Sequence, residues 1–272
     1  MHAVAVQDGA VVASAGDPEL VAYLRSSAKP FQALPLVRAR HDLATEEIAI
    51  ASASHLASPE QLAAARSLLA KAPATEEELE CGPEPTRIEH NCSGKHAGML
   101  AVCRAHGWPS RDYRLESHPV QRACLAEIAT AAGLSPGHVP VGVDGCGVPT
   151  WAMSLQRMAL AFARLEELEG GVTVANAMRA HPELIRGPRA ADTVLMRELP
   201  GWIAKGGAEG LLCAAGPAGV ALALKVEDGT TRATRSAAAE LLRRLGVETG
   251  ELAVVPLENS RGEVVGEIVA KR

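Results

Sequence analysis

The first sixty residues change from strand spacing to helical spacing of their apolar positions. "AVAV" and "AVVASA" flank Gln7-Asp8-Gly9, and an Asp-Gly pair between two apolar runs is a strong signal for a β-hairpin. After Pro30, the apolar residues of "FQALPLVRARHDL" recur with helical spacing. The next segment, "EEIAIASASH", is typical of a β-segment that ends at Ser54 and His55.

Helices are predicted to dominate up to the middle of the chain. One runs from Pro59 to Ala72 and is entered through Ser58, and two more cover the region after Gly94 and "HPVQRACLAEIATAAGL". Glycines then interrupt "VPVGVDGCGVP", which predicts a short strand with Asp144 and Cys146 at its end or in the following turn.

The second half alternates helical and strand patterns. Helices are predicted at 151–168 and 172–180, followed by neighbouring strands "GLLCAAG" and "GVALALKVEDG", the helix "RSAAAELLRRLG" and a terminal β-segment "GEVVGEIVAK". The chain has no repeats, low-complexity tracts or obvious linkers. We therefore predict one α+β domain over residues 1–272, with a sheet formed from both chain ends and helices between them.

Composition narrows the classes of partner and compartment. Apolar residues make up 47% of the 272 residues, enough for a substantial core. The net charge of −5 and the absence of a Lys/Arg cluster argue against nucleic-acid binding, so a small-molecule substrate is expected. No run approaches the roughly 18 apolar residues of a membrane span, and no signal peptide is recognised, so we expect a cytoplasmic protein without membrane association. The six cysteines are scattered, which predicts free thiols rather than a disulfide framework.

Ser26 and Lys29 are the first candidates for chemistry. A serine hydroxyl becomes a good nucleophile when a base removes its proton, and a lysine serves as that base when burial depresses its pKa. Three-residue spacing places both groups on one side of a helical turn, although Pro30 disfavours helical backbone at Lys29. The alternative for this pair alone is that Ser26 caps a helix and Lys29 is a solvated charge.

A second set of polar groups accompanies this pair. "KGGAEG" places Lys205 beside two glycines, Gly206 and Gly207, which permit close approach of a ligand. "SASHLAS" places Ser54 and His55 together, for which ordinary turn capping is the competing interpretation.

Two cysteines and a lysine suggest a metal site. "HNCSGKHAGM" presents Cys92 and Lys95 just before a helix, and "DGCG" presents Cys146. Thiolates suit zinc, but no Cys-x-x-Cys pair is present, and on chemistry alone each cysteine is better explained as a buried structural thiol. His90, His96 and Asp144 are the polar neighbours able to complete or orient such a site.

Six segments together resemble the rhizobial-type (class 3) L-asparaginase family, which is separate from the bacterial type I/II enzymes and the Thr-dependent plant-type enzymes. In chain order they are "GDPELVAYLRSSAKPFQALPL", "SASHLASPEQ", "HNCSGKHAGMLA", "DGCGVPTWAMSL", "HPELIRGPRAADTVLM" and "AKGGAEG". The resemblance implies a fold similar to serine β-lactamases and glutaminases, with a central antiparallel sheet. It also implies hydrolysis of L-asparagine to L-aspartate and ammonia, and a homodimer.

The resemblance also implies roles for individual residues. Ser26 and Lys29 form one Ser-Lys pair, and Ser54 forms another with a distal lysine, either Lys205 or, as the second choice, Lys225. A Zn²⁺ ion is held by two cysteines and a neutral lysine, which map to Cys92, Lys95 and Cys146. The substrate-binding set that we assign on this basis comprises Arg25, His55, Lys95, His96, Asp144, Gly206 and Gly207.

The mechanism expected from these assignments is a two-step acyl transfer. Lys29 deprotonates Ser26, which attacks the side-chain amide of asparagine, and water hydrolyses the resulting ester. Ser54 and Lys205 relay protons, and zinc positions the substrate or stabilises loops. Family members normally carry a longer strand region before the histidine that aligns with His2, and we expect the shortened N-terminus to expose the sheet edge or open the substrate site.

Two other functions are compatible with the same residues. A Ser-Lys site also suits glutamine, β-lactam or peptide hydrolysis, because pocket shape decides the substrate. A zinc-dependent amino-acid-binding protein that has lost turnover would show ligand-induced stabilisation without ammonia release.

Overall fold

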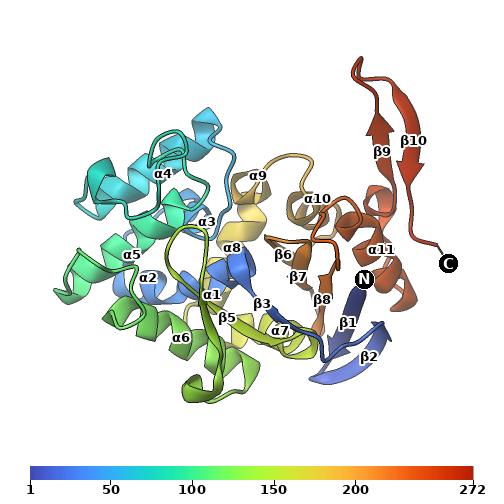
Figure 1. Cartoon of the computed structure of the whole chain (residues 1–272), viewed down its shortest axis with the longest axis horizontal. Helices are drawn as coiled ribbons and strands as arrows, with labels where there is room; N and C mark the ends of the chain where they lie inside the picture. Colours follow the sequence, from blue (N-terminus) through green and yellow to red (C-terminus); the bar gives the residue numbers. More distant parts are fainter. Residues whose placement is uncertain (272) are drawn as a thin grey trace.

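Five antiparallel strands form the central sheet of the computed structural model, which describes residues 1–271 (Figure 1). Their spatial order is β2-β1-β8-β7-β6. The strands are β1 (His2–Gln7), β2 (Ala10–Ala15), β6 (Ile203–Gly207), β7 (Leu211–Ala215) and β8 (Val220–Lys225). The sheet therefore joins the first strands of the chain to strands far along it, which confirms the predicted α+β fold with a sheet from both chain ends.

The β1–β2 hairpin has the predicted turn. Asp8 and Gly9 both adopt left-handed backbone conformations, with φ of +49° and +80°. Two positive φ values in a two-residue loop match the twist of the flanking strands, and an Asp-Gly pair tolerates them well. β2 lies at the edge of the sheet, whereas β1 is buried between β2 and β8.

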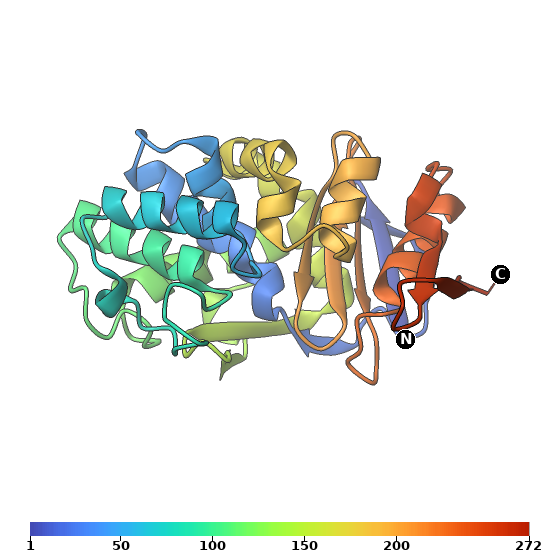
Figure 2. The same cartoon turned by 90° about the horizontal axis from the view of Figure 1, so that it is seen from above.

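Helices cover both faces of this sheet. α7 (Leu155–Ala163) packs against β1, β7 and β8. α10 (Ala191–Glu198) packs against β6 and β7, and α11 (Thr234–Arg244) packs against β1, β2 and β8. Figure 2 shows the sheet standing between α11 and a larger group of helices. That group contains α1 (Lys29–Gln32), α2 (Leu34–Ala39), α3 (Thr45–Ala51), α4 (Pro59–Lys71), α5 (Ser93–His106), α6 (Pro119–Ala132), α8 (Gly171–Ala180) and α9 (Pro182–Ile185).

The helix predicted from Pro59 follows local rules. The side chain of Ser58 accepts a hydrogen bond from the backbone N–H of Gln61, and the Gln61 side chain accepts one from the backbone N–H of Ser58. This capping box satisfies two N–H groups that would otherwise lack partners, and Pro59 occupies the first helical position, where no N–H is needed.

The β-segment predicted for "EEIAIASASH" is wrong, because residues 45–51 form helix α3. The Glu47 carboxylate accepts a hydrogen bond from the backbone N–H of Ala44, 2.8 Å away, which stabilises the first turn. Residues 48–51 are all buried against α4, α5 and α8. Because this helix is surrounded by other helices, its apolar residues do not show the one-sided pattern of a surface helix, and a short apolar run of this kind also fits a buried strand. Ser54 and His55 lie in the loop after this helix.

Two smaller sheets account for the remaining strands. β5 (Pro149–Ser154) pairs with β3 (Val21–Tyr23) and β4 (Val141–Val143), so the first residues of the helix predicted at 151–168 belong to a strand. Ser154 then caps α7 by accepting a hydrogen bond from the backbone N–H of Arg157. The terminal β-segment is β10 (Val264–Ile268), which pairs with β9 (Val255–Glu258) in a hairpin that stands away from the central sheet (Figure 1).

Two further predictions can be compared with this fold. All six cysteines are buried free thiols, as predicted. Among residues 1–271, no helix combines the length and the apolar character required to cross a membrane.

Candidate active site

Two buried lysines converge on one serine hydroxyl between the β6 edge of the sheet and the helices. The Nζ atoms of Lys29 and Lys205 each lie 3.0 Å from Ser54 Oγ, and both lysine side chains are fully buried. Lys29 also donates to the backbone carbonyls of Ala53 and Asn91, whereas Lys205 donates to the carbonyl of Gly206. Ser54 is therefore positioned to exchange protons with either amine.

Three separate parts of the chain deliver these groups. Lys29 opens α1 directly after the short 3₁₀ helix η1 (Arg25–Ala28), Ser54 follows α3, and Lys205 lies in the middle of β6. Gly207 allows β6 to approach η1, because a Cβ there would lie 2.9 Å from the Leu24 carbonyl oxygen. This close approach also lets Ser27 Oγ donate to the carbonyl of Lys205, 3.0 Å away.

Burial changes the protonation of both amines. Desolvation lowers the pKa of Lys29 below that of a free lysine, with an additional contribution from the charge of Lys95. Desolvation also lowers the pKa of Lys205 to about 7, although the Asp192 carboxylate, 3.7 Å from its Nζ, opposes the shift. A lysine with a pKa near neutrality can act as a base at physiological pH.

Ser26 differs from these groups because its side chain is half-buried and makes no hydrogen bond within residues 1–271. It follows Arg25, which adopts a left-handed backbone conformation with φ of +48°, a strained state for a non-glycine residue. The Lys29 amine is hydrogen-bonded to Ser54 rather than to Ser26. The half-buried Ser26 hydroxyl thus has no hydrogen-bond partner among the described residues.

Arg25 organises charge beside Ser26. Its Nε donates to Asp144 Oδ1 and its Nη1 donates to Glu209 Oε1, and each donor–acceptor distance is 2.6 Å. Burial raises the pKa of Asp144, but the charges of Lys95 and Arg25 prevail and hold it below its usual range. The structure thus places one cation, paired with two carboxylates, directly before Ser26 in the chain.

His55 is buried and neutral. Its Nε2 lies 2.8 Å from Ser93 Oγ, and its Nδ1 accepts from the backbone N–H of Ala57, so Nε2 carries the proton. Desolvation and the positive charge of Lys29 lower the pKa of His55 to about 4. His55 therefore supports Ser93 and the loop after Ser54 but makes no contact with the lysine amines.

The predicted zinc ligands also lie together. Lys95 Nζ is 3.0 Å from Cys146 Sγ, and both residues are buried, as is Cys92. A hydrogen bond with Cys92 and the charge of Lys95 lower the pKa of Cys146 to about 5, although burial opposes the shift. Within residues 1–271, no three His, Cys, Asp or Glu side chains form a metal-binding group. A third donor exists only if the Lys95 amine counts, and two soft thiolates with an amine suit zinc.

His96 lies deep next to this cluster. Its Nδ1 is 2.8 Å from the Tyr113 hydroxyl, which in turn accepts from the backbone N–H of Glu80. Its Nε2 is buried without a hydrogen-bond partner in the described part of the chain. Desolvation lowers the pKa of His96 well below its ordinary value, so the ring is neutral.

Comparison with known proteins identifies a family for this chain. A family model described as L-asparaginase II matches residues 1–270. The chain belongs to the L-asparaginase II family. Membership supports amidohydrolase activity and a small-molecule substrate, in agreement with the resemblance identified in the sequence.

Other comparisons are less informative for this L-asparaginase II family member. No curated protein sequence matches it significantly. A β-lactamase from Mycobacterium bovis is among the solved structures that match, with 15% identity, 84% coverage of this chain, 87% coverage of that protein and a TM-score of 0.35.

The structure also distinguishes the two lysines proposed for the second pair. Lys205 contacts Ser54, whereas Lys225 donates to the backbone carbonyls of Glu209 and Val226. Sequence reasoning missed Asp192, which is buried and accepts a hydrogen bond from the backbone N–H of Gly206 over 2.9 Å. Asp192 lies within the quoted segment "HPELIRGPRAADTVLM", but nothing in that segment predicts its contact with β6.

Proposed function

We propose that this protein hydrolyses L-asparagine to L-aspartate and ammonia through an ester formed on Ser26. The observation that carries the proposal is the hydrogen bonding of Ser54 Oγ to both buried lysine amines, one of which, Lys29, lies three residues after the half-buried Ser26. This arrangement supplies a nucleophile, a base and a path for protons within one amidohydrolase family member.

In the first step, Ser26 Oγ bonds to the side-chain amide carbon of asparagine while Lys29 takes its proton. The carbon–nitrogen bond then breaks, and the leaving nitrogen receives a proton and departs as ammonia. Ser54 can pass that proton because it contacts both Lys29 and Lys205. In the second step, water attacks the ester carbon, aspartate is released and Ser26 regains its proton.

Substrate orientation is assigned to the charged pair beside Ser26. Arg25 suits the α-carboxylate of asparagine and Asp144 suits its α-ammonium group, because each offers the opposite charge. The two side chains are 23% and 9% exposed, so the pair is partly shielded from solvent and its electrostatic preference is strengthened.

Zinc forms part of the same proposal. Cys92, Lys95 and Cys146 would hold it, and the bound ion would supply a fixed positive charge that orders the loops carrying Asp144 and Cys92. The proton transfers described above are assigned to the serines and lysines alone.

Ammonia release and intact-protein mass measured on the same samples test the function. We expect Ser26→Ala to lower kcat by about 10³-fold or more and to abolish any covalent adduct in acid-quenched samples. Ser14→Ala is the matched control, because Ser14 is an exposed serine on β2 outside the candidate site. Near-full ammonia release by Ser26→Ala would remove Ser26 as the nucleophile.

Substrate choice needs a separate comparison. We expect kcat/KM for L-asparagine to exceed that for L-glutamine and for a chromogenic β-lactam. A higher kcat/KM for either competitor would reassign the substrate, and thermal stabilisation by asparagine without ammonia release would indicate a binding protein.

A further inference from the structure

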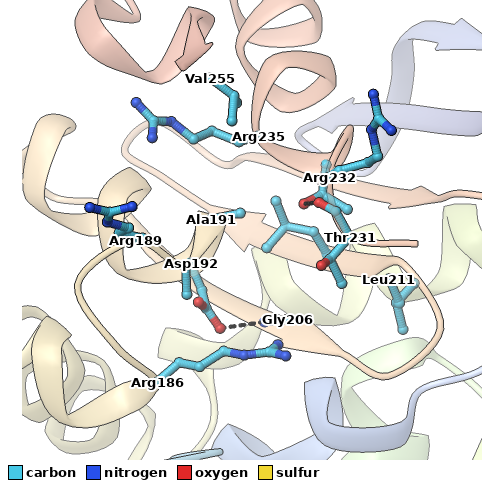
Figure 3. Close-up of a pocket in the computed structure, with 13 residues that line it drawn as sticks. Arg186, Arg189, Ala191, Asp192, Gly206, Leu211, Thr231, Arg232, Arg235 and Val255 are labelled. Carbon is cyan, nitrogen blue, oxygen red and sulfur yellow. Dashed lines mark hydrogen bonds between the residues drawn. The ribbon is translucent and has the colours of Figure 1, made fainter. Parts of the chain in front are cut away.

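A second pocket lies beyond the Ser54 site, next to Gly206 on β6 (Figure 3). It has a volume of about 210 Å³ and lies between α10, the strand pair β6–β7 and the beginning of α11. Its charged lining consists of four arginines and one carboxylate, which are Arg186, Arg189, Arg232, Arg235 and Asp192. A cavity of this size holds a ligand of several heavy atoms, since one liquid water occupies roughly 30 Å³.

The single carboxylate of the pocket is already engaged. Asp192 Oδ2 accepts from the backbone N–H of Gly206 and Oδ1 accepts from that of Thr193. Its nearest cation is Lys205 rather than a pocket arginine. Asp192 therefore forms no direct ion pair with a pocket arginine.

Several of these guanidinium groups have spare donors. Arg186 and Arg232 make no side-chain hydrogen bond or ion pair within residues 1–271, whereas Arg189 pairs with Glu258 over 3.0 Å. Arg235 donates to the carbonyl of Glu251, but its Nε is buried without a partner. Buried donors without acceptors are unfavourable unless a ligand or water satisfies them.

Backbone geometry adds to the positive potential. Helices α10 and α11 both begin at the pocket, since Ala191 and Thr234 line it, and helix N-termini favour negative charge. Gly206 lets Arg186 reach the pocket floor, because a Cβ there would lie 3.2 Å from Arg186 Nη1.

We propose that this pocket binds a small oxyanion, the phosphate or carboxylate group of a metabolite, through Arg186, Arg232 and Arg235. Guanidinium groups bind both kinds of oxyanion through paired N–H donors, and of the four in the lining only Arg189 forms an ion pair with a carboxylate within residues 1–271. The ligand is distinct from the asparagine of the proposed function, whose reacting atoms face Ser26 and Ser54.

A ligand in this pocket is also expected to change the protonation of Lys205, and the importance of that change rests on the proposed function. The charged groups that act on Lys205 are Asp192 on α10, Lys29 on α1, Arg186 in the loop before α10 and Cys92 before α5. Asp192 lines the pocket and its Oδ2 lies 3.7 Å from Lys205 Nζ, so an anion bound there adds negative charge near the amine. The charge of Arg186 lowers the pKa of Lys205, and a bound anion offsets that influence and favours the protonated amine. A bound anion should therefore slow hydrolysis near pH 7.

Calorimetric titration of the full chain with inorganic phosphate, and separately with L-aspartate, tests the site against sodium chloride of equal ionic strength. We expect saturable one-site binding of at least one anion, weakened about tenfold by Arg186→Gln and by Arg232→Gln. Arg111→Gln is the matched control, since Arg111 is exposed and lies outside the pocket. Binding of phosphate alone would identify a phosphate-bearing ligand, and binding of L-aspartate that these variants weaken would identify a carboxylate.

Two results would overturn the proposal. The first is that neither anion binds above the chloride reference, and the second is that both bind equally well to the wild type, the two pocket variants and the control. The exposed position of Arg232 makes its variant informative even if Arg186→Gln fails to fold. A saturating anion that leaves the midpoint of the pH–rate profile unchanged would refute the link to Lys205, whereas absence of asparagine hydrolysis leaves the calorimetric test intact.

Discussion

Two clusters in this molecule bury lysine amines, and they treat the amine in opposite ways. Around Ser54, Lys29 and Lys205 donate to hydroxyl and carbonyl oxygens, the Asp192 carboxylate lies 3.7 Å from Lys205 Nζ, and burial still lowers the pKa of both lysines. In the thiol cluster, burial alone would lower the pKa of Lys95, but the Cys146 and Cys92 sulfurs outweigh it and raise that pKa.

The difference shows that burial by itself does not create a basic lysine. All three amines are nearly inaccessible, and what separates them is whether nearby negative charge outweighs burial: Asp192 only partly offsets it at Lys205, whereas Cys146 and Cys92 exceed it at Lys95. A lysine among hydroxyls and carbonyls is suited to accept protons at neutral pH. A lysine hydrogen-bonded to a thiolate favours its protonated form.

Removing an amine from the Ser54 cluster should have the largest effect. Lys205→Met should lower kcat for asparagine by roughly 10²–10⁴-fold, because acid-base groups contribute on this scale. Lys225→Met is the matched control, since its amine contacts only backbone carbonyls, and it should change kcat by about twofold at most. Ammonia release measures both, and the opposite ranking would move the second lysine to position 225.

Disrupting the thiol cluster should lower zinc binding more directly than it lowers the rate of hydrolysis. Cys146→Ala should weaken zinc affinity by roughly 10²-fold, because a structural zinc site distributes its binding energy over few ligands. Metal analysis of the isolated protein measures this, with Cys124→Ala as a control for loss of a buried thiol outside the cluster. Equal zinc content in both variants would place the metal elsewhere or exclude it.

The pH dependence of the wild type sharpens the comparison further. Since the pKa of Lys205 is lowered to about 7, the neutral amine becomes more abundant as pH rises through that value. We expect kcat/KM to increase with pH, by about tenfold per unit below the midpoint, and to level off above it. His55 does not explain such a midpoint, because its pKa is lowered to about 4. An amine with this pKa titrates between roughly pH 5.5 and 8, so a kcat/KM that stays constant over that range would contradict a basic role for Lys205.

Local signals in the sequence predicted the parts of the fold that local chemistry determines. The Asp8-Gly9 hairpin and the Ser58 cap of α4 are examples, since turn and cap residues act on their immediate neighbours. Helix α3 was wrongly predicted as β because alternating isoleucine and alanine fit either element, and packing against three helices decides between them.

The sequence identified those site residues that lie within the segments resembling the L-asparaginase family. Ser54 contacts Lys205 and Lys95 contacts Cys146, whereas Lys29 hydrogen-bonds Ser54 and not Ser26, the partner that the resemblance implied; the roles of these residues stay predictions. Asp192 was missed because its importance arises from contact with Lys205 across the sheet edge, which no local spacing encodes. Charged neighbours brought in by topology are thus the part of a site that sequence patterns describe least well.

Asp192 also offers the smallest and most selective change. Its carboxylate raises the pKa of Lys205 against the effect of burial, so Asp192→Asn should lower that pKa and move the midpoint of the pH–rate profile down by about one unit. The asparagine oxygen can still accept from the backbone N–H of Gly206, which preserves the contact with β6. Glu183→Gln, an exposed carboxylate change on α9, should leave the midpoint unchanged. If Asp192→Asn lowers kcat at every pH without moving the midpoint, Asp192 holds β6 in place and does not set the basicity of Lys205.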